Sequence, residues 1–148
     1  MFYNFKKNKK AFTLVELIVV IAIIAILGAV VGVTVSSFVD KARVSAAKEP
    51  LTGIVDNWES YKIDSPNKTV KEVVAELFPN DKTNFLASAS TVWSTKVKDL
   101  TSGTVYIYFH NDSCGKYYGQ LKIESGAFKK DNVSTVEQKP TGAVDFPS

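Results

Sequence analysis

The sequence has little of the chemistry that catalytic and metal sites use. It contains one histidine and one cysteine in 148 residues. The single cysteine, Cys114, excludes an intrachain disulfide, and one histidine with one cysteine cannot supply the four ligands of a closed zinc site. His110, Asp112 and Cys114 fall in one short stretch, which we interpret as a turn and not as a catalytic site. The sequence therefore predicts no enzyme activity, metal or cofactor.

The loops also hold a few oxygen-bearing side chains that could bind calcium. They lack the spacing of an EF-hand, so no calcium site is predicted from them. These residues are Asp99, Asp112, Asp131 and Asn132.

Charge is missing from one long stretch near the N-terminus. Residues 17–35 contain no charged side chain, and Thr34 is the one polar side chain among them. About 20 apolar residues are enough to span the hydrocarbon core of a bilayer. From Ser36 on, charges of both signs, turn residues and aromatics are mixed, as in a water-soluble domain. The sequence therefore predicts a membrane-spanning stem that carries a soluble head.

Positive charge is concentrated just before this stem. Lys6, Lys7, Lys9 and Lys10 precede Ala11 with no acid among them, and together they exceed the whole formal net charge of +3. The head has no basic excess, so we predict no nucleic-acid binding by the head. Lysines beside a membrane span favour the cytoplasmic side. We therefore expect the N-terminus in the cytoplasm and the head across the membrane.

One carboxylate, Glu16, stands at the start of the apolar run. A charged side chain at the centre of a bilayer costs on the order of 3 kcal/mol on insertion scales, so a functional partner is expected for it. We find no such partner in the span of this chain. A cleaved secretory signal has an apolar core of only about 7–15 residues. An uncleaved signal anchor would explain the stem but not Glu16.

The stretch KKAFTLVELIVVIAII, residues 9–24, resembles the N-terminus of type IV prepilins and pseudopilins. The shared pattern is a short basic leader, a small residue, then Phe-Thr-Leu-x-Glu-Leu running into an apolar helix, and the resemblance extends to Gly32. It implies cleavage by a prepilin peptidase between Ala11 and Phe12 and N-methylation of Phe12. It also implies a filament core of bundled helices, in which Glu16 faces the Phe12 ammonium of a neighbouring subunit. In one departure, Ala11 stands where the family usually has glycine.

Two features of the stem helix bear on assembly. An ion pair between Glu16 and Phe12 of a neighbour would gain Coulomb energy in a low-dielectric core but lose hydration, so we expect it to set register more than stability. Gly28 and Gly32 have the spacing that lets two helices approach closely, or they simply weaken the helix by about 1 kcal/mol each. We take residues 28–32 as the place where the helix stretches in a filament.

The helix is predicted to continue into the head and to end near Asp64. Pro50 removes one backbone hydrogen bond and should kink it. Apolar residues at helical spacing should pack on a following sheet. They are Val44, Ala47, Leu51, Ile54, Val55, Trp58 and Tyr61.

The rest of the head is predicted to hold a short helix and an antiparallel hairpin. Thr69 and Glu72 have the spacing of a capping box, with apolar residues at helical intervals up to Pro79. Alternation of apolar and polar residues marks the strands. The expected elements are a loop at 81–99 with a helical turn near 85–88, strands at 104–110 and 116–124 around a turn at 111–115, a third strand at 127–130 or 133–137, and surface coil from Lys139.

Four tyrosines belong to the predicted hairpin: Tyr106, Tyr108, Tyr117 and Tyr118. Aromatic pairs across neighbouring strands stabilise a sheet by about 0.2–1 kcal/mol each. An exposed aromatic patch would instead mark a surface for subunit contact or adhesion. Both interpretations stay open at this stage.

The fold class that follows is α+β, with a long N-terminal helix packed on a small antiparallel sheet, which is also the roll that the resemblance implies. The chain is expected to divide into a basic leader at 1–11, a membrane-spanning and filament-core helix at 12–35, its amphipathic continuation at 36–64 and a globular head at 65–148. We expect a helical homo-oligomer.

The expected function is that of a structural subunit of a type IV pilus, serving adhesion, twitching motility or a related surface function. The precursor would lie in the cytoplasmic membrane with its head outside, and the assembled form in an extracellular filament. Its partners would be a prepilin peptidase and the pilus assembly machinery. Two alternatives remain: a minor pilin or pseudopilin of a competence or type II secretion system, and a monomeric, signal-anchored surface domain that binds a ligand.

Overall fold

The computed structural model describes residues 12–148, except for the side chain of Val33. The predicted leader at 1–11, with its lysines and Ala11, lies outside the described residues. The chain divides into two units, Met1–Val39 and Asp40–Ser148, which we describe separately. We call the second unit the head domain.

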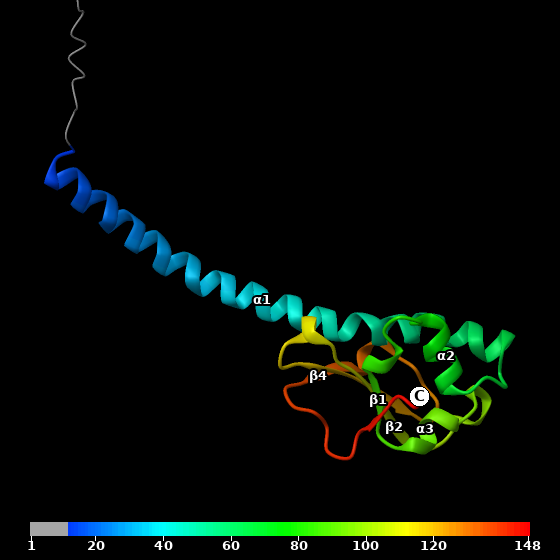
Figure 1. The fold of residues 1–148 in the computed structure, drawn as a ribbon. Helices are drawn as coiled ribbons and strands as arrows, with labels where there is room; N and C mark the ends of the chain where they lie inside the picture. Colours follow the sequence, from blue (N-terminus) through cyan, green and yellow to red (C-terminus); the bar gives the residue numbers. More distant parts are fainter. Residues whose placement is uncertain (1–11) are drawn as a thin grey trace, which may run out of the picture. The chain divides into compact units, whose positions relative to one another are not determined.

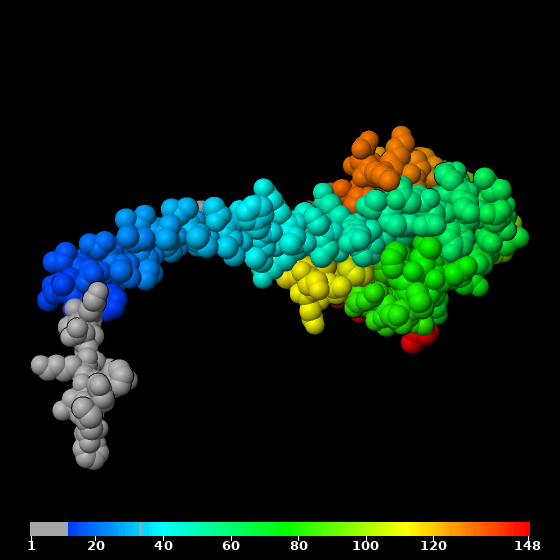
Figure 2. Space-filling view, turned by 90° about the horizontal axis from the view of Figure 1, so that it is seen from above, coloured from blue at the N-terminus to red at the C-terminus, as the bar shows by residue number. Residues whose placement is uncertain are grey.

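One long helix, α1 (Leu14–Asp64), belongs to both units and ends at the predicted residue. Within the head domain, four of its side chains are at most 1% exposed: Ala47, Leu51, Ile54 and Trp58. They recur every three to four positions, which is the spacing of one face of a helix. In Figure 1 this part of α1 lies along one side of the sheet, and Figure 2, seen from the helix side, shows its outer surface uncovered.

The sheet of the head domain has five antiparallel strands in the order β4-β3-β2-β1-β5. Its core face carries alternating residues such as Ile107 and Phe109, which pack with the buried stripe of α1. This arrangement confirms the predicted α+β class. The strands are β1 (Phe85–Ala87), β2 (Thr104–Phe109), β3 (Tyr118–Glu124), β4 (Val133–Val136) and β5 (Val144–Asp145).

Two short helices complete the head domain, α2 (Val70–Leu77) and α3 (Ser90–Ser94), together with four 3₁₀ turns. The predicted capping box at the start of α2 is present. Glu72 Oε2 accepts hydrogen bonds from the Thr69 backbone N–H (2.7 Å) and hydroxyl (2.9 Å), while the Thr69 hydroxyl accepts from Glu72 N–H. The 3₁₀ turns are η1 (Lys82–Asn84), η2 (Val97–Asp99), η3 (Asp112–Cys114) and η4 (Lys130–Asn132).

The helix approaches the sheet very closely at Gly119. A Cβ atom built on Gly119 would lie 1.9 Å from the carbonyl oxygen of Ala47, far inside any real contact distance. Because glycine has no side chain, the α1 backbone can pack directly against β3 at this position.

Three predictions for the head were wrong, and the structure decides between the two positions predicted for a third strand. Residues 85–87 form the inner strand β1, not a helical turn, because Phe85 and Ala87 pair with β2 and are fully buried. The tail is not all coil, since β5 pairs with β1 and Phe146 packs against Trp93, with ring centroids 5.1 Å apart. The strand expected from Lys116 begins at Tyr118. Of the two places for a third strand, 133–136 is correct.

Candidate functional site

The first turn of α1 carries the residues to which the sequence assigns assembly. Glu16 Oε2 accepts two hydrogen bonds from Thr13, one from its backbone N–H and one from its hydroxyl, each 2.9 Å long. The Thr13 hydroxyl in turn accepts from Glu16 N–H over 3.2 Å. This reciprocal pair is a capping box, which satisfies backbone donors that the first turn of a helix otherwise leaves free.

Glu16 therefore has a hydrogen-bonding partner in Thr13, which lies before the charge-free stretch at 17–35, where the sequence offers no partner. The signal was available, because Thr13 and Glu16 have the same spacing as Thr69 and Glu72. A neutral hydroxyl and a peptide N–H lower the cost of placing this carboxylate among apolar residues but do not neutralise its charge. A countercharge is still required for a fully apolar environment.

Phe12 comes directly before this capping box, and 83% of its surface is exposed. Glu16, in the first turn of α1, and Phe12, just before it, thus lie close together in sequence at the start of the helix. The predicted cleavage between Ala11 and Phe12 falls at the boundary of the described residues, because Ala11 lies outside them.

The helix that follows is apolar on all sides. Its most apolar window has a mean hydropathy of 3.1, and the described residues include one helix long and apolar enough to cross a membrane. Large side chains around its whole circumference are about half to three-quarters exposed, including Leu14, Ile21 and Val31. A helix that is hydrophobic all round is stable only when lipid or other helices surround it.

Gly28 and Gly32 lie inside this apolar stretch, and α1 is continuous through both. A Cβ atom at either position would meet nothing within 4 Å in the described residues. No contact among the described residues therefore requires glycine at these two positions. Close helix packing and helix stretching in a filament both remain predictions for them.

Pro50 lies within α1 in the head domain, and the helix continues on both sides of it. It cannot donate to the carbonyl four residues earlier, so one hydrogen bond is missing from the helical ladder there. The predicted kink at Pro50 stays a prediction.

The stretch that contains the single histidine and cysteine is a structural turn. Cys114 is fully buried, and its thiol donates to Asn111 Oδ1 over 3.2 Å. Burial raises the pKa of the Cys114 thiol, which disfavours the reactive thiolate. His110 Nδ1 lies 2.9 Å from the carbonyl oxygen of Tyr117, and its ring stacks on Tyr118. His110 thus serves the hairpin and not a nucleophile.

Oxygen-bearing residues considered for calcium are spread over separate turns. Asp99 ends η2, Asp112 begins η3, and Asp131 and Asn132 belong to η4. Among residues 12–148, no group of three or more histidine, cysteine, aspartate or glutamate side chains is placed to hold a metal ion.

Comparison with known proteins bears on the N-terminal segment. Residues 6–32 match the model of the prokaryotic N-terminal methylation motif. This segment is thus similar to the N-terminus of proteins with that motif, in line with the resemblance to type IV prepilins and pseudopilins noted from the sequence. This match includes Phe12, Glu16 and both glycines, so the family motif and the capped apolar helix coincide.

A curated relative extends the likeness to a secretion protein. The chain is 37% identical over 60 residues to the type II secretion system core protein G of Pseudomonas aeruginosa, a stretch that covers 40% of this chain and 42% of that protein. The chain therefore matches less than half of its relative's length. No solved structure matches the chain.

Proposed function

We propose that the chain is a non-enzymatic structural subunit of a type IV pilus or pseudopilus, which polymerises through its N-terminal helix. The observation that carries this proposal is the position of Glu16. It caps a helix whose N-terminal part is apolar on every side and which begins at Leu14, shortly after Phe12. Cleavage between Ala11 and Phe12 would create an ammonium group at Phe12, whose methylation would leave it positively charged.

Assembly then exchanges one environment of the stem for another. In the membrane, lipid surrounds the apolar side chains and Thr13 binds Glu16 Oε2. In the filament, neighbouring stems replace the lipid, and the Phe12 ammonium of another subunit binds the same carboxylate. An ionised carboxylate has about four acceptor positions, so the two bonds from Thr13 leave room for this cation. Glu16 can therefore keep its helix cap while it pairs across the interface.

The location and partners follow from this proposal. The precursor lies in the cytoplasmic membrane with its N-terminus inside and its head domain outside, where a prepilin peptidase and the assembly machinery act on it. The product is an extracellular helical homo-oligomer. The apolar helix and the methylation motif support this topology.

Mass spectrometry of the mature protein tests the proposal. We expect a chain that begins at Phe12 and carries a methyl group on its α-nitrogen. A mature protein that keeps residues 1–11 would instead support the monomeric, signal-anchored domain. Substitution of Ala11 by lysine, which is too large for a site that requires a small residue, should retain the leader and provides the control.

A second candidate within the family is a secretion pseudopilin, favoured by the relative that is a core protein of a type II secretion system. Deletion of the chain separates the two candidates. Loss of surface filaments seen by electron microscopy after labelling of the head domain, with normal protein export, supports a pilus. Loss of protein export without any visible surface filament supports a pseudopilus.

A further inference from the structure

The sheet has an outer face, turned away from the core, on which side chains line up across strands. The registers place Leu86, Tyr108, Gln120 and Ser134 side by side on β1, β2, β3 and β4. The centre of this row is covered, since Leu86 is 6% and Tyr108 is 7% exposed. The tyrosines are therefore not one open aromatic patch.

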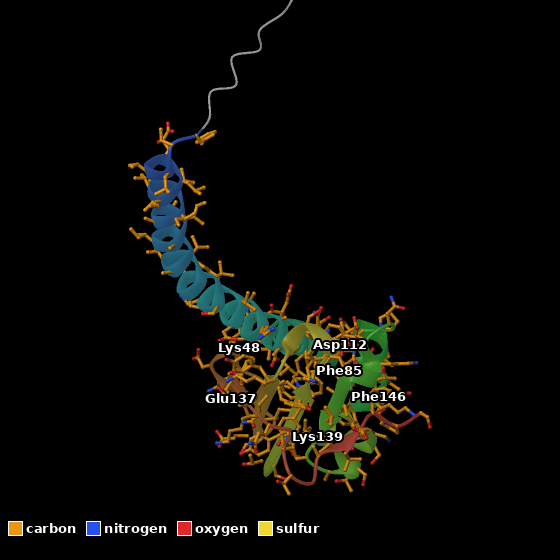
Figure 3. All side chains as sticks on the ribbon, turned by 60° about the vertical axis from the view of Figure 1, so that its left-hand side comes forward. Lys48, Phe85, Asp112, Glu137, Lys139 and Phe146 are labelled. Carbon is orange, nitrogen blue, oxygen red and sulfur yellow. The ribbon has the colours of Figure 1, made fainter. Side chains whose placement is uncertain are left out.

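Two hollows adjoin this outer face, and Lys139 lines both of them. The smaller, about 180 Å³, lies among Asn84, His110, Tyr118 and Asp145. The larger, about 410 Å³, is lined by residues 136–141 and Gln120. In Figure 3, Glu137 and Lys139 lie below Lys48 of α1, with Lys139 on the side of the head domain away from that helix.

The charged side chains around these hollows are already paired. Lys139 Nζ lies 3.3 Å from Asp145 Oδ1, and Glu137 Oε1 lies 3.1 Å from Lys116 Nζ. Neither hollow therefore offers an unbalanced charge from these residues to a charged ligand. Uncharged groups that donate or accept hydrogen bonds remain, including the amides of Asn84, Gln120 and Gln138.

The smaller hollow also has an aromatic wall held in a fixed orientation. The rings of His110 and Tyr118 are nearly parallel, with centroids 4.0 Å apart and an interplanar angle of 13°. The bond between His110 Nδ1 and the Tyr117 carbonyl fixes the imidazole. Each ring uses one face in the stack, so the outer face of each ring is not used by this contact.

A flat aromatic wall beside amides and balanced charges suits a ring that is apolar on its faces and rich in hydroxyl groups at its rim. We propose that the two hollows beside Lys139 together bind a neutral saccharide. One sugar unit would lie in the smaller hollow, against His110 and Tyr118, and the next unit in the larger hollow, beside Gln138. This inference concerns the head domain alone and does not depend on polymerisation of the stem.

Saturation-transfer NMR on the full-length protein in detergent micelles tests it. The probes are the neutral sugars glucose, galactose, N-acetylglucosamine and lactose, the anionic glucuronic acid and the cationic glucosamine. We expect saturable binding of at least one neutral sugar at millimolar concentration, tighter binding of the disaccharide than of its single units, and weaker binding of both charged sugars. Absence of saturable binding by every neutral sugar, or preference for a charged one, would overturn the proposal.

Variants locate the site. Tyr118→Val should weaken binding of the neutral sugar about tenfold, through loss of the aromatic wall. Tyr106→Val is the matched control, because Tyr106 is an outer-face tyrosine of β2 that lines neither hollow, and it should bind as the unaltered protein does. If Tyr118→Val does not fold, Gln138→Ala is used instead, because Gln138 is exposed. Loss of its amide should abolish the higher affinity for lactose than for galactose. Equal binding by the variants and the unaltered protein would contradict the assignment.

Discussion

Thr13 donates both its backbone N–H and its hydroxyl to Glu16 Oε2, each over 2.9 Å, at the first turn of α1. The carboxylate that enters an apolar environment is thus already bound within its own subunit. In the proposed assembly, only a positive charge has to be added to it. Glu16 would then have two roles, as the local cap of the helix and as the countercharge for a neighbouring subunit.

Substitution of Thr13 tests the local role. Thr13→Val removes the hydroxyl that binds Glu16 and should destabilise the first turn by about 1 kcal/mol, equivalent to roughly a fivefold change in an equilibrium. We expect a several-fold lower ratio of filament to membrane pool, measured by quantitative immunoblot of sheared and cell-bound fractions. Thr13→Ser keeps the hydroxyl and should assemble normally. Equal yields from the valine and serine variants would show that the cap has no part in assembly.

The paired glycines of the stem give the second prediction. The double variant with Gly28→Ala and Gly32→Ala should strengthen the helix of the monomer by about 1 kcal/mol per site, because none of the described side chains lies within 4 Å of the added methyl groups. Filament yield should nevertheless fall, if neighbouring helices pack closely there or the helix stretches. Val30→Ala, which introduces an alanine between the two glycines without removing either of them, should leave yield unchanged. A filament of normal yield, with unbroken helix through both alanines, would refute a special role for these glycines.

The capping box of α2 makes stability depend on pH. Hydrogen bonds from the backbone N–H and the hydroxyl of Thr69 lower the pKa of Glu72 below its ordinary value. A carboxyl whose pKa is depressed by folding adds stability above its unfolded pKa, and that stability is lost as pH falls through its folded pKa. Thermal unfolding monitored by circular dichroism between pH 7 and pH 3 should therefore show a smaller acid-induced drop in Tm for Glu72→Gln than for the unaltered protein. An equal acid-induced drop in Tm for the two proteins would contradict a stabilising role of the ionised Glu72 side chain.

Gly119 allows a sharp test of the contact between helix and sheet. Gly119→Ala puts a methyl carbon within 1.9 Å of the Ala47 carbonyl oxygen, so the helix must move away from β3. We expect a loss of roughly 3 kcal/mol in the free energy of unfolding, at the upper end of what overpacking costs. Gln120→Ala, one residue along the same strand but on the outer face, should change stability far less in urea titrations. Similar midpoints for both variants would mean that the close approach is not a constraint.

Local signals predicted the parts of the fold that local chemistry decides. The buried face of α1 from Ala47 to Trp58 and the capping box of Thr69 and Glu72 each depend on residues only a few positions apart in the sequence. Both predictions are confirmed. Strands β1 and β5 were missed because each is too short to show alternation. Phe85 becomes a strand residue through its pairing with Phe109, and Val144 through its pairing with Ala87. Such distant partners leave no mark in the neighbouring sequence.

The candidate site shows a different limit. Thr13 and Glu16 have the spacing of a capping box, but a carboxylate beside a long apolar run suggests a charged partner, and the apolar run contains none. A hydroxyl and a backbone N–H one turn away satisfy hydrogen bonding without any charge. The two hollows that Lys139 lines could not be predicted from sequence either, since residues as distant as Asn84, Tyr118 and Asp145 meet there only after folding.

Filament yield of Glu16→Gln is the measurement that tests the central claim most directly. Glutamine keeps an oxygen that accepts from Thr13, so the capping box and membrane insertion should survive, while the negative charge is lost. If the Phe12 ammonium of a neighbour requires that charge, Glu16→Gln should accumulate in the membrane and fail to form filaments, as Glu16→Ala should. Normal filaments from Glu16→Gln, with unchanged subunit register by electron cryomicroscopy, would contradict the account.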